Sequence, residues 1–323
     1  MQLSIDVGHG YVKTWSSRGD RVIFPALIQR APTTVDLGAF GRASITRIDG
    51  DDYLVGEAAR RLATPLWSRD KASDDETLRL MLAAAAECGA NGPVRLATGL
   101  PLAWWGDQRQ ALQHALHGFG GTVVRPDGRT LHLWFETVLV LPQGVAAAGP
   151  VLDQSVYAPG PYLVVDVGYR TTDFIVVTKQ DTGALEFDAL AAGSLELGMH
   201  AVDAALAESL TAVHHTEFTA VQVANAESVV VRGRRLDIQN ERANRAVQVA
   251  RRIARGLTER LDRQMDHLLG LVAVGGGSHL LAQSIPGVIQ PADPQWANAR
   301  GYLAALVAMG GSTAQGEHCD ALA

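Results

Sequence analysis

The sequence predicts an α/β protein made of two related domains, and two observations support that prediction. Apolar, β-rich runs alternate with segments in which apolar residues recur every three or four positions, a pattern typical of mixed or parallel sheets covered by helices. Sliding the chain against itself by 160 residues also places residues 3–12 over 163–172, with four of ten positions identical. Since this offset is about half of the 323 residues, the simplest interpretation is two similar halves.

Each copy of the repeat predicts a β-hairpin. An apolar run ends in Asp-Val-Gly at Asp6 and again at Asp166, a short polar turn follows, and a second β-rich run covers 11–15 or 172–178. We therefore expect an acidic residue at the end of the first hairpin strand in both halves.

The remaining elements follow in chain order. Residues 33–52, rich in Gly, Thr and Asp, are expected to form an excursion outside the core, and an Ala-rich helix over 78–88 is closed by Gly89. Apolar positions at helical spacing predict one long amphipathic helix over 241–267. Further predicted elements are a strand over 94–100, a helix over 104–117, one or two strands over 130–141, a helix beginning within 143–148, a strand over 271–274 and a closing helix over 296–309.

The composition excludes several classes of protein. The two cysteines, Cys88 and Cys319, stand alone, so neither a disulfide scaffold nor a structural zinc site is indicated. The N-terminus lacks a basic segment followed by a long apolar run, and no apolar stretch approaches the ~20 residues that a membrane span needs. We therefore expect a cytoplasmic protein without a membrane partner.

The first hairpin has the residues of a phosphate-binding turn. Gly8 and Gly10 allow a tight turn whose backbone N–H groups point into one concavity, and Lys13 can add a positive charge. Lys13 stands out because only three of the 28 basic residues are lysines. Asp6 is a suitable ligand for Mg²⁺, which usually keeps most of its waters.

The second hairpin offers a similar set of groups. Its polar residues are Asp166, Gly168, Arg170, Thr171, Thr172 and Asp173. Two such loops can bind one Mg-nucleotide between them; the alternative is that each carboxylate only satisfies backbone donors at the end of a hairpin.

A third Gly-rich element follows the predicted strand over 271–274. Gly275, Gly276 and Gly277 permit close approach of the backbone to a ligand, and the helix that follows favours anionic or polar groups at its start. No Lys-Ser or Lys-Thr pair follows and the pattern is not GxGxxG, so neither a Walker loop nor hydride chemistry is supported. A plain strand-to-helix turn remains the alternative.

These motifs, in this order and spacing, resemble those of the actin-like ATPases, and within them the ParM/StbA-type plasmid-segregation proteins. The resemblance covers essentially the whole chain. The matching segments are residues 6–13 as the first phosphate loop, 142–147 as the connecting helix, 166–173 as the second phosphate loop, 275–277 as the adenosine loop, and further matches at 53–57, 98–101 and 293–301.

The resemblance implies an actin-like fold with two RNase-H-like domains and a nucleotide cleft between them. Domain I would cover 1–150 with a C-terminal return over 308–323, and domain II would cover 151–307.

The resemblance also implies roles for individual residues. Asp6 and Asp166 would hold the hydrated Mg²⁺, Lys13 would contact phosphates, and Gln143 would orient the attacking water. The residues implied in binding ATP are Gly8, His9, Gly10, Tyr11, Lys13, Gly168, Tyr169, Arg170, Thr171, Gly275, Gly276 and Gly277. Larger side chains than the family often has flank both turns, and whether Arg170 reaches a phosphate or solvent stays open.

The implied function is that of an ATP-dependent, filament-forming ATPase that segregates plasmid or other DNA through a DNA-bound adaptor protein (ParR-like), with hydrolysis regulating polymer stability. Two alternatives remain open: a sugar-kinase-type small-molecule kinase of the same superfamily, and a non-polymerising ATP-binding regulator. Against the kinase, the connecting motif carries Gln143 and the chain is short for an added specificity segment.

The segment 228–263 is strongly basic in a chain of net charge −6. It holds ten arginines, from Arg232 to Arg263, and four acids, which leaves +6 here and −12 over the rest. A solvated helix face, a contact with a subunit or adaptor, and direct DNA binding are the three explanations. Since no helix-turn-helix or aromatic-interleaved basic patch accompanies the charge, we do not expect direct sequence-specific DNA binding.

Overall fold

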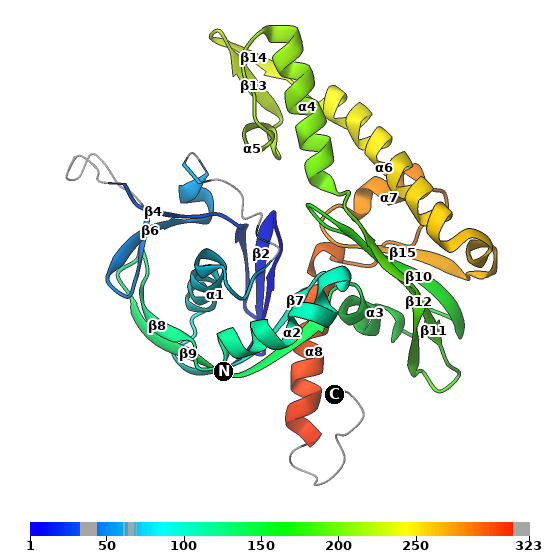
Figure 1. The fold of residues 1–323 in the computed structure, drawn as a ribbon, viewed down its shortest axis with the longest axis horizontal. Coiled ribbons are helices and arrows are strands. Elements are labelled where there is room, and N and C mark those ends of the chain that lie inside the picture. Colours follow the sequence, from blue (N-terminus) through cyan, green and yellow to red (C-terminus); the bar gives the residue numbers. More distant parts are fainter. Residues whose placement is uncertain (33–43, 61, 64–67, 69, 313–323) are drawn as a thin grey trace. The chain divides into compact units, whose positions relative to one another are not determined.

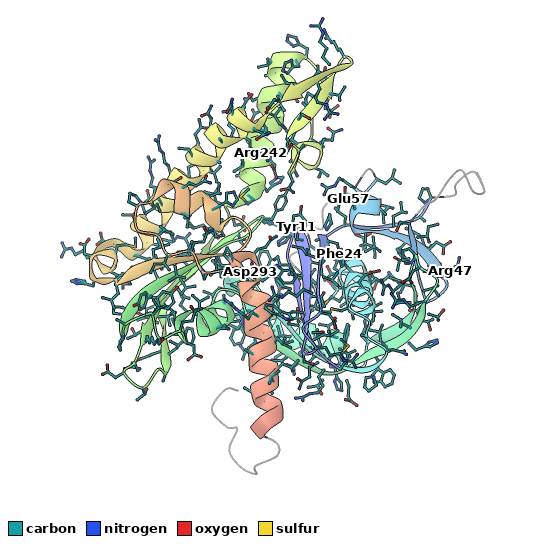
Figure 2. All side chains as sticks on the ribbon, turned by 180° about the vertical axis from the view of Figure 1, so that it is seen from behind. Tyr11, Phe24, Arg47, Glu57, Arg242 and Asp293 are labelled. Carbon is teal, nitrogen blue, oxygen red and sulfur yellow. The ribbon has the colours of Figure 1, made fainter. Side chains whose placement is uncertain are left out.

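The computed structural model describes residues 1–32, 44–60, 62, 63, 68 and 70–312. The chain divides into two compact units, drawn as a ribbon in Figure 1 and with side chains in Figure 2. Unit 1 comprises Met1–Leu100, Trp104–Pro142 and the segment from Asn298, and unit 2 comprises Pro101–Ala103 and Gln143–Ala297. The expected boundary between 150 and 151 would instead cut the helix α3 (Val145–Leu152). Of the expected return over 308–323, residues 313–323, with Cys319, lie outside the described residues.

The sheet of unit 1 follows the order β3-β2-β1-β7-β9-β8-β5-β6-β4 in the described part of the chain. β1 pairs antiparallel with β2 and parallel with β7, so β1 is a central, buried strand. The strands are β1 (Gln2–Val7), β2 (Tyr11–Ser16), β3 (Arg21–Pro25), β4 (Ile28–Arg30), β5 (Ile45–Ile48), β6 (Asp51–Val55), β7 (Gly92–Leu100), β8 (Gly120–Val124) and β9 (Thr130–Pro142).

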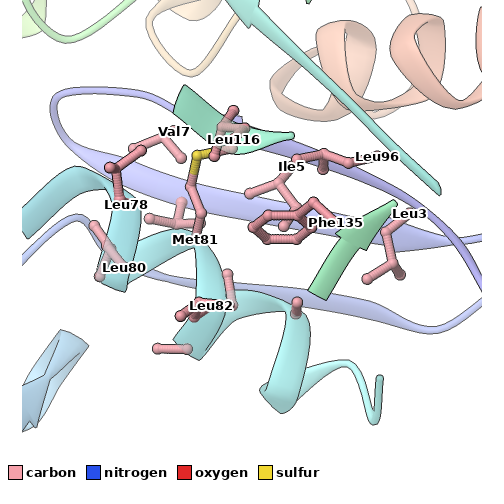
Figure 3. Close-up of a cluster of buried hydrophobic side chains, with 14 of the residues drawn as sticks. Leu3, Ile5, Val7, Leu78, Leu80, Met81, Leu82, Leu96, Leu116 and Phe135 are labelled. Carbon is pink, nitrogen blue, oxygen red and sulfur yellow. The ribbon is translucent and has the colours of Figure 1, made fainter. Parts of the chain in front are cut away.

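The core of unit 1 is built around α1 (Asp75–Glu87), about which the sheet curls in Figure 1. Because its alanines are small, this helix packs closely and is buried on nearly all sides. Figure 3 shows Leu78 and Met81 of α1 against Ile5 of β1 and Phe135 of β9. Two further helices in the first half of the chain are α2 (Leu102–Leu116) and the short 3-10 helix η2 (Gly56–Ala59).

The C-terminal helix α8 (Ala297–Ser312) follows the 3-10 turn η4 (Pro294–Trp296). Its Tyr302 is fully buried, and a Cβ built on Gly99 of β7 would lie 1.9 Å from the Tyr302 hydroxyl oxygen. Gly99, in the Thr-Gly-Leu-Pro segment of residues 98–101, is therefore required for α8 to pack on β7.

Unit 2 repeats the beginning of this arrangement. Its sheet has the order β12-β11-β10-β15, with β10 antiparallel to β11 and parallel to β15, as β1 is to β2 and β7. The two hairpins that the sequence repeat predicts are therefore equivalent in topology. The strands are β10 (Gly160–Val167), β11 (Thr172–Lys179), β12 (Leu185–Leu195) and β15 (Gly270–Val274).

Helices cover both faces of the sheet in unit 2. Alternate residues of β10 face opposite sides: Leu163 packs with Ile253 and Leu257 of α6 (Gln239–Leu261), whereas Val164 packs with Val151 of α3. α7 (Ser278–Ser284) follows β15, and α4 (Met199–His214) follows β12.

An additional lobe of unit 2 contains elements that the sequence analysis did not predict. The hairpin of β13 (Ser228–Val231) and β14 (Arg234–Asp237) and the short helix α5 (Ala220–Val223) pack on α4. Their buried cluster contains Leu206, Leu210, Val223, Val229 and Ile238. The Arg-rich segment 228–263 is therefore not one helix: residues 228–237 form this hairpin, and most of the remaining residues form α6.

The structure corrects the expected end of one helix and, in part, the expectation for a second segment. The helix expected over 241–267 ends at Leu261, because Asp262 adopts a left-handed φ of 42° and the 3-10 helix η3 (Asp262–His267) follows. The excursion expected over 33–52 is only partly testable, since 33–43 lie outside the described residues. Residues 45–48 and 51–52 belong to the main sheet, where Ile48 is buried in the core.

Within the described residues, none of the helices combines the length and apolar character that crossing a membrane requires.

Candidate functional site

The first candidate site lies where β1 ends in unit 1. Asp6 stands directly opposite Lys13 on β2, and Lys13 Nζ is 2.7 Å from Asp6 Oδ2. Asp6 is buried, with an exposed fraction of 2%, because β1 is a central strand, and Lys13 is mostly buried, with an exposed fraction of 11%. A carboxylate and an ammonium group are thus held side by side at the start of the turn.

The turn after β1 is tight, and residues outside it, Ala26 and Trp104, contact it. The Gly8 N–H donates to the Tyr11 carbonyl at 3.1 Å, and a Cβ on Gly8 would lie 3.1 Å from that oxygen. The Gly10 carbonyl accepts from the Ala26 N–H at 3.0 Å, and the His9 ring packs edge-to-face on Trp104 with centroids 5.9 Å apart. The predicted loop residues 8–11 therefore form one braced turn beside Asp6.

Lys71 is a residue of this region that the sequence analysis missed. It precedes α1, is only 5% exposed, and its Nζ donates to the Val7 carbonyl at 2.6 Å. The rarity of lysine was the one sequence signal that could have identified it, since no motif surrounds it.

The second candidate site lies where β10 ends in unit 2. The Gly168 N–H donates to the Thr171 carbonyl at 2.8 Å, and a Cβ on Gly168 would lie 3.0 Å from that oxygen. This is the turn of residues 8–11 repeated at the same offset of 160 residues. The equivalence extends to the strands, where Asp166 occupies the position of Asp6.

The residue opposite the carboxylate differs between the two hairpins. Where unit 1 has Lys13, unit 2 has Asp173, which faces Asp166 across the hairpin. Asp173 accepts hydrogen bonds from the Ser194 hydroxyl and, at 3.2 Å, from the Leu102 N–H. Burial raises the pKa of Asp173 to about 7; the charge of Asp166 adds to the rise and the hydrogen bond from Ser194 opposes it.

The three glycines after β15 let the backbone pass next to Asp166. Gly275 has a φ of 85°, and a Cβ there would lie 2.1 Å from Asp166 Oδ1. The Gly277 N–H donates to the Val167 carbonyl at 2.8 Å, which fixes the start of α7 against the end of β10. A Cβ on Gly276 would be 3.6 Å from Gln295 Nε2, in ordinary contact.

The same turn is also anchored by the first residue of η4. The Gly275 N–H donates to the Pro294 carbonyl at 2.8 Å. Asp293, labelled in Figure 2, has a left-handed φ of 51° and directs the chain into Pro294. The beginning of the sequence segment 293–301 is therefore tied to the Gly-rich turn.

The residue after Gln143, Gly144, lies beside the aspartates of unit 2. Gln143 is 9% exposed, and Gly144 has a φ of 76° that turns the chain into α3. A Cβ on Gly144 would be 3.9 Å from the Cβ atoms of both Asp166 and Asp173. The structure thus places the backbone of Gly144 and of Gly275 beside Asp166, and the role of Gln143 stays a prediction.

The first turn of α4 braces the second loop. The Met199 and His200 N–H groups donate to the carbonyls of Gly168 and Tyr169, at 3.1 and 2.7 Å. The Tyr169 and His200 rings pack at 5.5 Å between centroids. Burial lowers the pKa of His200, and the positive charge of Arg170 lowers it further. The contact of Arg170 with a phosphate stays a prediction.

The donor set of both hairpins suits a hydrated Mg²⁺ ion. Asp6 and Asp166 each stand at the end of a buried strand, beside a turn that a side chain would obstruct. The part of the chain that the structure describes contains no group of three or more His, Cys, Asp or Glu side chains placed to hold a metal. Mg²⁺ needs only one or two protein carboxylates, whereas Zn²⁺ or Ca²⁺ would require more protein ligands.

Two family models match the chain in succession. Residues 4–145 match the family of actin like proteins, N terminal domain, and residues 164–286 match the archaeal actin homologue MreB-like family, C-terminal. The first match includes Asp6 to Lys13, and the second includes Asp166 to Thr171 and the three glycines.

The chain is similar over nearly its full length to curated archaeal proteins. An archaeal actin homologue of Thermoplasma acidophilum is 29% identical over 320 residues, which cover 93% of this chain and 97% of that protein. A second archaeal actin homologue, from Thermoplasma volcanium, is 28% identical with the same coverage.

Solved structures show the same architecture. An archaeal actin homologue in complex with ADP is 26% identical and superposes with a TM-score of 0.78, covering 95% of this chain and 99% of that one. A 15-stranded ParM filament from Clostridium botulinum has a subunit that is 20% identical, with a TM-score of 0.81 and the same coverage. At that identity, the second likeness is one of fold alone.

Proposed function

Since the chain belongs to the actin-like proteins and has their fold over nearly its whole length, we propose that it binds ATP with Mg²⁺, hydrolyses the nucleotide and assembles with further copies of itself into filaments in the cytoplasm.

The observation that supports this proposal most directly is the repeated phosphate-type turn. Gly8 to Tyr11 and Gly168 to Thr171 have the same hydrogen bond, and each turn follows a buried aspartate. Phosphoryl transfer needs positioned donors and neutralised charge more than covalent help from the protein. Backbone N–H groups of such turns meet that need for phosphate oxygens.

Each group has a role in this proposal. Asp6 and Asp166 would hold the hydrated Mg²⁺, which would supply positive charge to the phosphates. Lys13 and the turn of residues 8–11 hold phosphates, as does the turn of residues 168–171. Gly275, Gly276 and Gly277 accept the adenosine. Gln143 orients the attacking water through its neutral amide, which aligns the water without acting as a strong base.

The proposals of polymerisation and of cargo rest on the family resemblance rather than on any residue described above. A protein of the same fold forms a 15-stranded filament. ATP would favour the assembling conformation, and hydrolysis would weaken subunit contacts and so time disassembly. The cargo that we propose is plasmid or other DNA, held through a DNA-bound adaptor protein.

Light scattering and pelleting over a concentration series, with ATP, ADP or no nucleotide, test the proposal. We expect a critical concentration that is lowest with ATP, and phosphate release that rises steeply above it. If the protein does not pellet at any protein or salt concentration, and phosphate release is strictly linear in protein concentration, the proposal of filament assembly is wrong. ATP consumption that depends on an added hydroxyl compound would indicate the kinase instead.

The role of Gln143 is tested separately. Gln143→Ala is expected to bind ATP as the wild type does and to lose most hydrolysis, by about 10²-fold, in the range of a lost positioning donor. Hydrolysis at the wild-type rate would show that another group orients the water.

A further inference from the structure

The three lysines of the chain all make specific contacts, although 25 of the 28 basic residues are arginines. Lys13 pairs with Asp6, as described above. Lys71 and Lys179 are buried, at 5% and 7% exposure, and each donates to backbone carbonyls. Burying an ammonium group is costly, so these two positions need a physical reason.

Lys179 has a structural role within unit 2. Its Nζ donates to the carbonyls of Leu152 and Gln154, at 2.7 and 2.9 Å, and so holds the C-terminal end of α3. Lys179 is the last residue of β11, whereas the turn of residues 168–171 lies at the other end of that strand. Lys179 is therefore remote from the candidate phosphate turn.

Lys71 lies instead at the candidate phosphate turn of unit 1. Its acceptor is the carbonyl of Val7, the one residue between Asp6 and Gly8. Val7 also pairs with Val12, which closes the hairpin from inside. The ammonium thus reaches the turn across 64 residues of sequence, and it fixes the peptide group from which the Gly8 N–H projects.

We propose that Lys71 is a positioning residue of the first phosphate turn. By holding the Val7 carbonyl it fixes the peptide group between Val7 and Gly8, whose N–H closes the turn on the Tyr11 carbonyl, and its charge adds to that of Lys13 in attracting the polyphosphate of the nucleotide. A lysine suits this task because its compact ammonium can share its donors among several oxygens, whereas the planar guanidinium of arginine is larger and rigid. This inference rests on the proposed binding of ATP.

Three substitutions separate the contributions of Lys71. Lys71→Met keeps a side chain of similar length but has no charge and no donor. Lys71→Gln restores a donor for the Val7 carbonyl without charge, and Lys71→Arg restores charge. Lys179→Met is the matched control, because it removes an equally buried lysine that also binds backbone carbonyls.

The measurement is the Kd for ATP by calorimetry at several salt concentrations, with thermal unfolding of each variant in parallel. We expect Lys71→Met to weaken ATP binding by about tenfold or more, which is about 1.4 kcal/mol. Lys71→Gln and Lys71→Arg are each expected to recover part of that loss. The loss of charge also predicts a shallower dependence of the Kd on salt for Lys71→Met and Lys71→Gln than for the wild type. Lys179→Met is expected to unfold at a lower temperature and to keep the wild-type Kd.

The outcomes distinguish this inference from the proposed function. Wild-type ATP affinity in Lys71→Met, while Lys13→Ala binds weakly, overturns the role of Lys71 and leaves ATP binding intact. An equal loss in Lys179→Met shows that the effect arises from reduced folding and also overturns it. Absence of ATP binding by the wild type overturns both. If Lys71→Met does not fold, the comparison of Lys71→Gln with the wild type decides.

Discussion

Asp173→Asn tests whether the carboxyl opposite Asp166 is protonated in the folded protein. Burial raises the pKa of Asp173 from its ordinary 3.8 to about 7. The folded state therefore keeps the proton over a pH range in which the unfolded chain has lost it. An asparagine has the shape and donor pattern of the protonated acid, so Ser194 and Leu102 keep their acceptor in the variant.

Proton linkage gives the direction and the size of the change in unfolding free energy with pH. A raised folded pKa contributes stability that is fully present below pH 4 and is lost as the pH rises to about 7. Over that window the wild type should lose up to about 1.4 kcal/mol per pH unit, or about 4 kcal/mol in total. Above pH 7, Asp173→Asn should be more stable than the wild type by up to about that amount.

The assay is urea unfolding followed by circular dichroism from pH 4 to pH 8, without nucleotide and with a chelator. Amide exchange in β11 reports on unit 2 in the same samples. Asp181→Asn, in the exposed turn between β11 and β12, is the control for removing a carboxyl group. Parallel stability curves for the wild type and Asp173→Asn would refute the reasoning, since the carboxyl would then titrate alike in both states.

Three further predictions use other parts of the structure. Gly275→Ala should abolish ATP binding, because its Cβ would lie 2.1 Å from Asp166 Oδ1. Gly287→Ala is the control: Gly287 has a similar φ of 78°, but its Cβ would have nothing within 4 Å, so this variant should only lose stability. Equal ATP affinities of the two variants would refute this prediction. Arg242 Nη1 lies 2.6 Å from Oδ1 of Asp203, whose side chain is 4% exposed. Arg242→Met should lower the free energy of unfolding in urea by about 3–5 kcal/mol, because it leaves this carboxylate buried without its ion-pair partner. A loss below about 1 kcal/mol would contradict the prediction. Charge reversal of the exposed arginines on α6 should alter pelleting or adaptor binding, and unchanged behaviour would identify a solvated helix face. These arginines are Arg251, Arg252 and Arg255.

The Arg-rich segment illustrates how tertiary contacts divide a charge pattern. Arg242 binds Asp203, Val223 and Ala226, and Arg260 donates to the Ser194 carbonyl at 2.7 Å. These arginines hold elements of unit 2 together. The net +6 counted along the sequence is therefore not one uniform surface, because part of it serves internal contacts.

Helix ends and short additional elements were the least predictable parts of the fold. The apolar periodicity of α6 continues as far as Met265, but the left-handed Asp262 ends the helix four residues earlier, at Leu261. The β13–β14 hairpin was missed since its four-residue strands are stabilised by packing on α4. Periodicity reports which face is apolar, and does not report where a neighbouring element stops the helix.

The sequence by itself determined the two equivalent hairpins, their aspartates and their glycine turns. Those features depend on local chemistry: alternation of apolar residues specifies the strands, and only glycine permits such close turns. Tertiary structure alone decided what stands next to each turn. It placed Lys71 on the Val7 carbonyl, 64 residues away in the sequence, and it buried Asp173, which raises the pKa of that carboxyl. Burial and long-range contacts set a group's charge state and partners, and neither is written in the residues around it.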